Sequence, residues 1–135
     1  MKLIEGDLEF DFDNDYWSQV IKFDVHVDYR KVTEKIPGTK GVDFTGILGQ
    51  DTFVVIEVKD FRGSRIENKQ RDEPLDLEVS KKFIGTLATI IGGNRTSTHG
   101  RNMWKDYLNL IRAPTEEIKV ILWLEEDSSN QPANK

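Results

Sequence analysis

The stretch Phe53-Val54-Val55-Ile56-Glu57-Val58-Lys59 decides the fold, because it is an apolar run that ends in a carboxylate and an ammonium. Four consecutive apolar residues are typical of a strand that is buried on both faces. Side chains alternate along a strand, so Glu57 and Lys59 project from the same face. A buried strand with this ending indicates that this edge of the sheet has a chemical role.

A hairpin is predicted to bring Asp43 beside these two residues. Gly41-Val42-Asp43-Phe44 begins a strand, and the polar group Gly49-Gln50-Asp51-Thr52 closes a turn onto Phe53. Directly opposed residues share a face, so a loop with an odd number of residues pairs Asp43 with Glu57 or Lys59, whereas an even loop turns Asp43 away. Two carboxylates and a lysine on one spot can hold a divalent cation and activate a water.

Hydrophobic periodicity predicts the remaining elements. We expect an edge strand over residues 8–12, a helix from Asn14 to about residue 23, a helix from Pro74 to Ile91 that Gly92-Gly93 ends, a helix over Arg101 to Arg112, and a strand from Ile118 to Leu124 that is covered on both faces. Residues 23–29 also alternate as a strand would, so two periods compete there. The last strand returns through helices and can lie parallel to its neighbour.

This order of elements predicts an α/β fold, a three-layer α/β/α sandwich with a central mixed β-sheet. A chain of 135 residues is a normal size for one domain. We expect residues 1–125 to form a single α/β domain and residues 126–135 to form a disordered polar tail.

Composition excludes several classes of protein. The chain has no Cys, so disulfides and thiolate zinc sites are excluded. No segment approaches the roughly 18 to 20 apolar residues of a membrane span, and the N-terminus lacks a signal peptide, so we expect a soluble cytoplasmic protein. The net charge is −5, but residues 58–112 carry 11 Lys and Arg against 7 Asp and Glu. A polyanion could be bound by that basic part.

The segments Gly41-Val42-Asp43-Phe44 and Val55-Ile56-Glu57-Val58-Lys59-Asp60, joined by a hairpin and followed by a helix, resemble the core of the restriction-endonuclease-like, or PD-(D/E)xK, nucleases. The resemblance covers about residues 15 to 124, although its specific part is Asp43, Glu57 and Lys59. Val42 departs from the pattern, because it stands where the name of the family puts proline.

The resemblance implies a restriction-endonuclease-like fold and a DNA endonuclease that depends on Mg²⁺, with Mn²⁺ as a substitute. It also implies that Asp43 and Glu57 bind the metal, that Lys59 lies near the attacking water, and that the carbonyl of Val58 is a backbone ligand. Many members use a further acid from an N-terminal helix. Asp24 is the best-placed candidate for that acid in this chain, with Asp28 and Glu34 behind it.

Physical chemistry supports the same roles. Mg²⁺ prefers oxygen ligands and takes one or two protein carboxylates together with waters and phosphate oxygens. Asp43 and Glu57 supply that number. Lys59 can orient the nucleophile or stabilise the negative charge that develops on the phosphate.

Four basic residues are expected to contact phosphates. Arg62 and Arg65 follow the Glu57 strand directly, and Lys81 and Lys82 fall off the apolar stripe of the long helix and should face outward. The alternative for each of them is an ordinary solvated surface. DNA is the expected partner, and duplex DNA would call for a homodimer, because cutting both strands at one site needs two active sites.

Two other functions stay open at this stage. The chain could have the nuclease fold without catalysis and serve as a binding or interaction module, which the overall negative charge would fit. It could also be an unrelated α/β domain in which Glu57 and Lys59 are a surface ion pair. Carboxylates of Asp43 and Glu57 that can share one ion would argue against the last of these.

Overall fold

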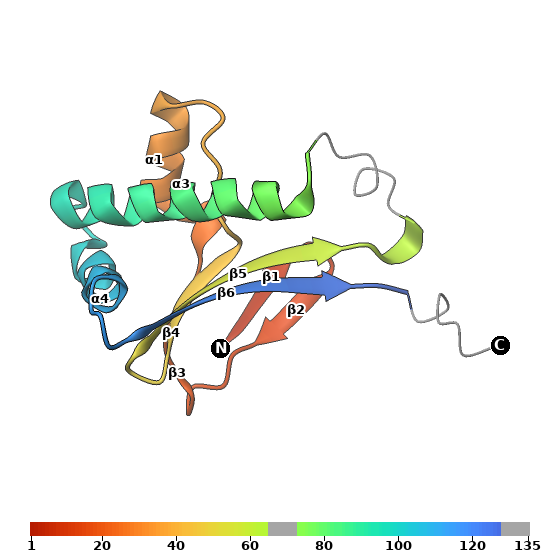
Figure 1. Ribbon diagram of the computed structural model, residues 1–135, viewed down its shortest axis with the longest axis horizontal. Helices are drawn as coiled ribbons and strands as arrows, with labels where there is room; N and C mark the ends of the chain where they lie inside the picture. The colour runs from red at the N-terminus through yellow and green to blue at the C-terminus, as the bar shows by residue number, and fades with distance from the viewer. Residues whose placement is uncertain (65–72, 128–135) are drawn as a thin grey trace.

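The computed structural model describes residues 1–64 and 73–127 (Figure 1). The strands are β1 (Lys2–Glu5), β2 (Leu8–Asp11), β3 (Trp17–Lys22), β4 (Phe44–Leu48), β5 (Thr52–Asp60) and β6 (Glu117–Glu125). The α-helices are α1 (Val27–Lys35), α3 (Leu75–Thr96) and α4 (Arg101–Ile111), with short 3-10 helices η1 (Phe23–Val25) and η2 (Arg62–Ser64). Most of the tail predicted to be disordered, residues 128–135, lies outside the described residues.

Among the described residues, the main sheet has four strands in the order β3-β4-β5-β6. The β3–β4 and β4–β5 pairs are antiparallel, and β6 lies parallel to β5. The chain reaches β6 through α3 and α4, which is the long crossover that a parallel pair requires. The predicted α/β class, the mixed sheet and the parallel last strand are therefore confirmed.

The β4–β5 hairpin has the register that the odd loop demanded. Three residues, Gly49 to Asp51, join the strands, and Gly49 has a φ of 63°, which favours glycine. Leu48 pairs with Thr52 and Phe44 with Ile56, so Asp43 and Glu57 directly follow the last pair of this ladder. The backbone N–H of Asp43 donates to the Ile56 carbonyl at 3.2 Å, at the end of this ladder.

The two faces of the sheet are covered differently. Phe53 and Val55 of β5 pack with Trp104 and Tyr107 of α4 on one face. Alternate residues of the same strand, together with Phe44, meet the apolar side chains of the small β1–β2 sheet on the other face. The predicted second helical layer is wrong among the described residues, since the β1–β2 hairpin lies there and the helices lie across the sheet from it (Figure 1).

The predicted helix over residues 14–23 is also wrong. Residues 17–22 form β3, because Val20 packs on the hairpin side of the sheet and its neighbour Ile21 packs on the helix side. Only a strand directs adjacent side chains to opposite faces. The helix begins later, at Val27, where Nδ1 of His26 accepts a hydrogen bond from the Asp28 N–H at 3.0 Å and caps the helix.

Helix α3 does not end at Gly92-Gly93 as predicted but continues to Thr96. Gly93 is a close-packing position, because a Cβ there would lie 2.4 Å from the indole of Trp104. Ile84 and Ile91, two large apolar residues of this helix, are exposed. Although α3 has 22 residues, no helix in the described ranges is long and apolar enough to cross a membrane.

Strand β6 was expected to be covered on both faces, but it is an edge strand. Within residues 1–64 and 73–127 it pairs with β5 alone, at the margin of the sheet (Figure 1). Four of its large apolar side chains are between 40% and 49% exposed, namely those of Ile118, Val120, Trp123 and Leu124. The apolar sequence of β6 is typical of a central strand, but β6 lies at the edge of the sheet.

Candidate functional site

Asp43 and Glu57 form the centre of the candidate site. Asp43 comes directly before β4 and is 6% exposed, and Glu57 in β5 is 1% exposed. The Asp43 Oδ2 atom accepts a hydrogen bond from the Val58 N–H at 2.7 Å, which fixes the carboxylate at the end of the β4–β5 ladder. This hydrogen bond holds the buried Asp43 carboxylate against the residue that follows Glu57 in β5.

The two carboxylate oxygens of Glu57 have different surroundings. Oε2 accepts a hydrogen bond from the Lys82 ammonium and lies 3.7 Å from the Lys59 Nζ atom. Oε1 is buried and has no hydrogen-bond partner in the described part of the chain. A buried acceptor without a partner is costly, so such an atom calls for a ligand or a function.

Helix α3 completes a ring of alternating charges with Glu57 and Lys59. Glu78 accepts a hydrogen bond from Lys59, and it also lies 3.9 Å from Lys82, four residues later on the same helix. The prediction that Lys82 faces outward is wrong, because the buried Glu57 carboxylate draws it to the sheet. Sequence reasoning missed Glu78, although its i, i+4 spacing from Lys82 was a usable signal.

A second group of acids meets Asp43 from the N-terminal part of the chain. One carboxylate oxygen each of Glu5, Asp24 and Asp43 lie within 4.8 Å of one another. The Lys22 ammonium donates to Glu5, and to Asp24 at 3.1 Å. Asp24, the best-placed candidate among the N-terminal acids, therefore lies beside Asp43. Glu5 was missed, because its place depends on how the β1–β2 hairpin docks.

The other two candidate acids lie elsewhere. Asp28 accepts a hydrogen bond from the Trp104 indole N–H at 2.7 Å, which ties the start of α1 to α4. Burial raises the pKa of Asp28, but other effects, the hydrogen bonds from Trp104 and Ser97 foremost, outweigh it and lower the pKa overall. Glu34 is exposed on α1. Neither residue belongs to the group of acids around Asp43.

The site carries a surplus of negative charge. Its five carboxylates and three ammonium groups leave two negative charges when all are ionised, on Glu5, Asp24, Asp43, Glu57 and Glu78 against Lys22, Lys59 and Lys82. Burial and the nearby charge of Glu57 raise the pKa of Asp43 from 3.8 to about 8. Asp43 therefore holds a proton at neutral pH in the metal-free chain, and a cation that binds there would replace it.

Lys82 stays charged in this environment. Burial lowers its pKa, but the hydrogen bond and the charge of Glu57 raise it by more, so that the pKa of Lys82 lies above its ordinary value. The ammonium thus neutralises one of the buried carboxylates. The other oxygen of Glu57 has no hydrogen-bond partner in residues 1–64 and 73–127.

The residues predicted to contact phosphates are only partly available. Arg62 makes two hydrogen bonds to Asp60, each at 2.9 Å, in a bidentate pair just beyond β5. Lys81 is exposed and pairs with Glu73 at 2.6 Å. Arg65 lies outside the described residues. A phosphate would have to compete with Asp60 for Arg62 and with Glu73 for Lys81.

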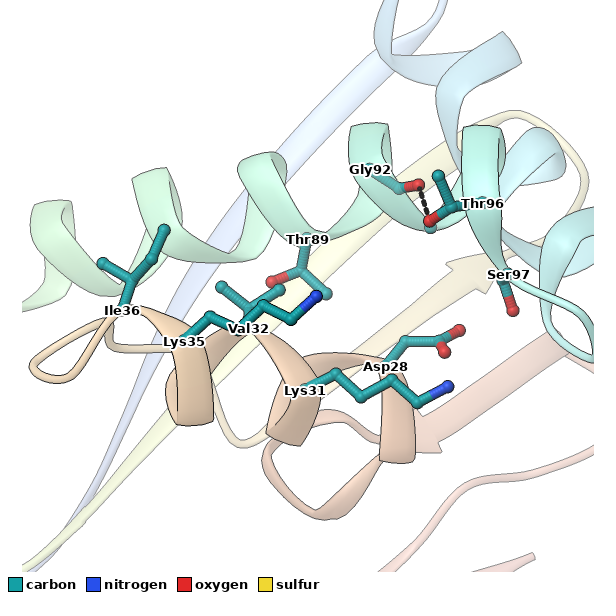
Figure 2. A pocket seen from close by; sticks show the side chains of 10 residues that line it. Asp28, Lys31, Val32, Lys35, Ile36, Thr89, Gly92, Thr96 and Ser97 are labelled. Carbon is teal, nitrogen blue, oxygen red and sulfur yellow. Dashed lines mark hydrogen bonds between the residues drawn. The ribbon is translucent and has the colours of Figure 1, made fainter.

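A separate cavity of about 240 Å³ lies between α1 and α3 (Figure 2). Its polar groups are largely satisfied, since the Thr96 hydroxyl donates to the Gly92 carbonyl at 3.0 Å and the Thr89 hydroxyl donates to the Gly85 carbonyl at 2.9 Å. Asp28, which points into it, is held by Trp104. We assign no role to this cavity, because it contains none of the five acids of the candidate site.

The chain matches no family model, and no curated protein or solved structure shows significant similarity to it. The candidate site is therefore defined by its own geometry. Its distinguishing features are the buried acids Asp43 and Glu57 and the Lys59 and Lys82 ammonium groups near Glu57. A further feature is the Glu57 Oε1 atom, which has no hydrogen-bond partner among the described residues.

Proposed function

We propose that this chain is a restriction-endonuclease-like nuclease that hydrolyses DNA phosphodiester bonds with Mg²⁺, or with Mn²⁺ in its place. The observation that carries the proposal is the Glu57 Oε1 atom, which is buried without a hydrogen-bond partner among the described residues. Glu57 precedes Val58, whose N–H donates to the Asp43 carboxylate. A buried carboxylate oxygen of this kind suits a cation better than it suits an ion pair, because the two lysines near Glu57 approach its other oxygen.

The donor set fits a hard divalent cation. Every acidic group at the site offers oxygen, and Mg²⁺ commonly uses one or two protein carboxylates and keeps its remaining positions for water and substrate. Asp43 and Glu57 would hold the ion, with Asp24 within reach of the Asp43 carboxylate. When bound, the ion would lower the pKa of a coordinated water and offset negative charge on the phosphate.

The lysines supply the complementary positive charge. Lys59 is largely buried, lies 3.7 Å from Glu57 and is held by Glu78, so its ammonium has a fixed direction at the site. A cation held in this way can orient an attacking water and stabilise charge that develops on the scissile phosphate. Lys82 balances Glu57 in the absence of metal.

The fold assignment rests on the strand that carries Glu57 and Lys59, its antiparallel partner that follows Asp43, and the long helix after it. The β1–β2 hairpin in place of a second helical layer is a departure from the predicted sandwich. The absence of Cys suits a reducing compartment, so we place the activity in the cytoplasm.

A nuclease fold without catalysis is the second candidate. It is favoured by the contacts of Lys82 to Glu57 and of Lys22 to Asp24, because these ion pairs neutralise acids that a metal would otherwise balance. In that case the site would be a structural ion-pair network, and the chain would act as a binding module.

Cleavage of labelled single-stranded, duplex and branched DNA tests the proposal. Wild type, Lys59→Ala and the control Lys105→Ala, at an exposed residue of α4, are each assayed with Mg²⁺, with Mn²⁺ and with chelator. We expect cutting that needs metal, is lost by at least about a hundredfold in Lys59→Ala and persists in Lys105→Ala. Folded wild-type protein that cuts none of the substrates would remove the nuclease assignment and favour the second candidate.

A further inference from the structure

Strand β6 presents an unusual edge for a strand at the margin of a sheet. It is nine residues long, and in the described part of the chain it pairs on one side only. Edge strands are commonly short or heavily charged, because an open row of N–H and C=O groups recruits other strands. Here the edge carries exposed Val120 and Leu124 on the helix face and exposed Trp123 on the hairpin face.

The sequence of β6 is complementary to itself in one antiparallel register. Opposed residues in an antiparallel pair share a face. In a symmetric pair of β6 strands, the two-fold axis perpendicular to the sheet must therefore lie between the two copies of one residue, and we name each register by that residue. An axis at Leu122 sets Lys119 opposite Glu125 and Val120 opposite Leu124, twice each. In this register each Lys119 forms an ion pair with a Glu125, and each Val120 lies opposite a Leu124.

Neighbouring registers lack this match. An axis at Ile121 sets Glu117 opposite Glu125 twice, and like charges in that position are destabilising. An axis at Trp123 sets Ile121 opposite Glu125. An axis at Val120 leaves Lys119 against an apolar partner. Charge and hydrophobicity therefore select a single register.

We propose that two copies of this chain pair through β6, antiparallel and centred on Leu122, to form a continuous eight-stranded sheet. The second copy supplies hydrogen bonds to the open edge of β6. It also covers the exposed apolar side chains and pairs Lys119 with Glu125 across the two-fold axis.

This pairing has a consequence for the candidate site. Glu57 is the β5 neighbour of Leu122, so three strand spacings, or about 14 Å, would separate the two copies of Glu57 on the same face of the joined sheet. The candidate sites of the two copies would then be close enough to contact one DNA duplex. This consequence rests on the proposed nuclease function, whereas the pairing itself does not.

Cysteine cross-linking tests the register directly, because the natural chain contains no Cys. In Leu122→Cys the two Cα atoms would lie roughly 4.5 to 5.5 Å apart, within the range of a disulfide. In Val120→Cys they would lie about 14 Å apart, which a disulfide cannot span. We expect Leu122→Cys to form disulfide dimers under mild oxidation at least about tenfold faster than Val120→Cys. Equal rates, or no cross-linking of either variant, would overturn the proposed register.

Analytical ultracentrifugation of the full chain tests the pairing without a new thiol. We expect wild type to dimerise, Lys119→Glu and Glu125→Lys each to weaken the dimer at least about tenfold, and the double charge reversal to restore it. Ile84→Lys, at an exposed apolar residue of α3, should leave the dimer intact. A monomer at every concentration, or a dimer that Ile84→Lys abolishes and the charge reversals leave unchanged, would overturn the proposal. Neither experiment uses nuclease activity, so its result is independent of the proposed function.

Discussion

The Lys82 ammonium on α3 donates a hydrogen bond to the Oε2 atom of Glu57 on β5, although 25 residues separate the two in sequence. This contact ties the long helix to the central strand at the candidate site. It also shows why Lys81 and its neighbour Lys82 differ, because Lys81 is exposed and pairs with Glu73 on the protein surface.

Removal of the Lys82 charge should destabilise the protein far more than removal of the Lys81 charge. In Lys82→Met a buried carboxylate loses its hydrogen-bonded partner, which typically costs about 3 to 5 kcal/mol. Lys81→Met removes an exposed pair and should change the free energy of unfolding by about 0.5 kcal/mol or less. Urea denaturation of both variants in chelator measures the difference. Equal losses would show that the Glu57–Lys82 contact does not stabilise the fold.

The stability of the metal-free protein should fall as pH rises from about 4 to 8. The pKa of Asp43 is about 8 in the folded chain and near its ordinary 3.8 when the chain is unfolded, so the folded state binds more protons over that range. Stability falls with pH wherever the folded state binds the extra proton. Asp43→Asn cannot ionise, and at pH 8 in chelator it should exceed wild type by at least about 1 kcal/mol.

Denaturant unfolding at pH 5 and pH 8 checks this expectation. The control is Asp15→Asn, at an exposed residue near the start of β3, which should keep the wild-type dependence on pH. If Asp43→Asn keeps the same dependence on pH as wild type, the burial of an acid at residue 43 does not control it.

Two adjacent glycines of α3 should respond in opposite ways to alanine. Gly92 has nothing within 4 Å of an added Cβ, so Gly92→Ala should stabilise the helix by about 0.5 to 1 kcal/mol. Gly93→Ala would force a methyl group against the Trp104 indole and should cost about 1 to 3 kcal/mol. Thermal denaturation compares the two variants directly. A stabilised Gly93→Ala would contradict the close packing of α3 on α4.

The part of the fold that sequence predicts well is local. The apolar run before Glu57 predicts β5, and the polar group after Leu48 predicts the hairpin, whereas the odd length of its loop was left open by the sequence. The i, i+4 pair Glu78 and Lys82 was readable in the same way. These features depend on residues close in sequence.

The parts that failed depend on tertiary contacts. The spacing of Trp17, Val20 and Ile21 fits a helix, but pairing with β4 makes this segment a strand, with a register shift between Trp17 and Gln19. Glu5 reaches the site only because the β1–β2 hairpin docks on the free face of the sheet. The pattern at Gly93 predicts a helix end, whereas in the structure Gly93 allows Trp104 to pack closely on α3. Local sequence patterns do not show which distant segments will pack on these residues.

The central claim is that Asp43 and Glu57 share a divalent cation, and calorimetric titration with Mn²⁺ tests it most directly. Wild type should bind the ion, Glu57→Gln should bind it at least about tenfold more weakly, and Glu9→Gln, at an exposed residue of β2, should match wild type. Circular dichroism confirms that each variant is folded. Wild-type protein that binds no Mn²⁺, or a Glu57→Gln variant that binds it equally well, would contradict the account.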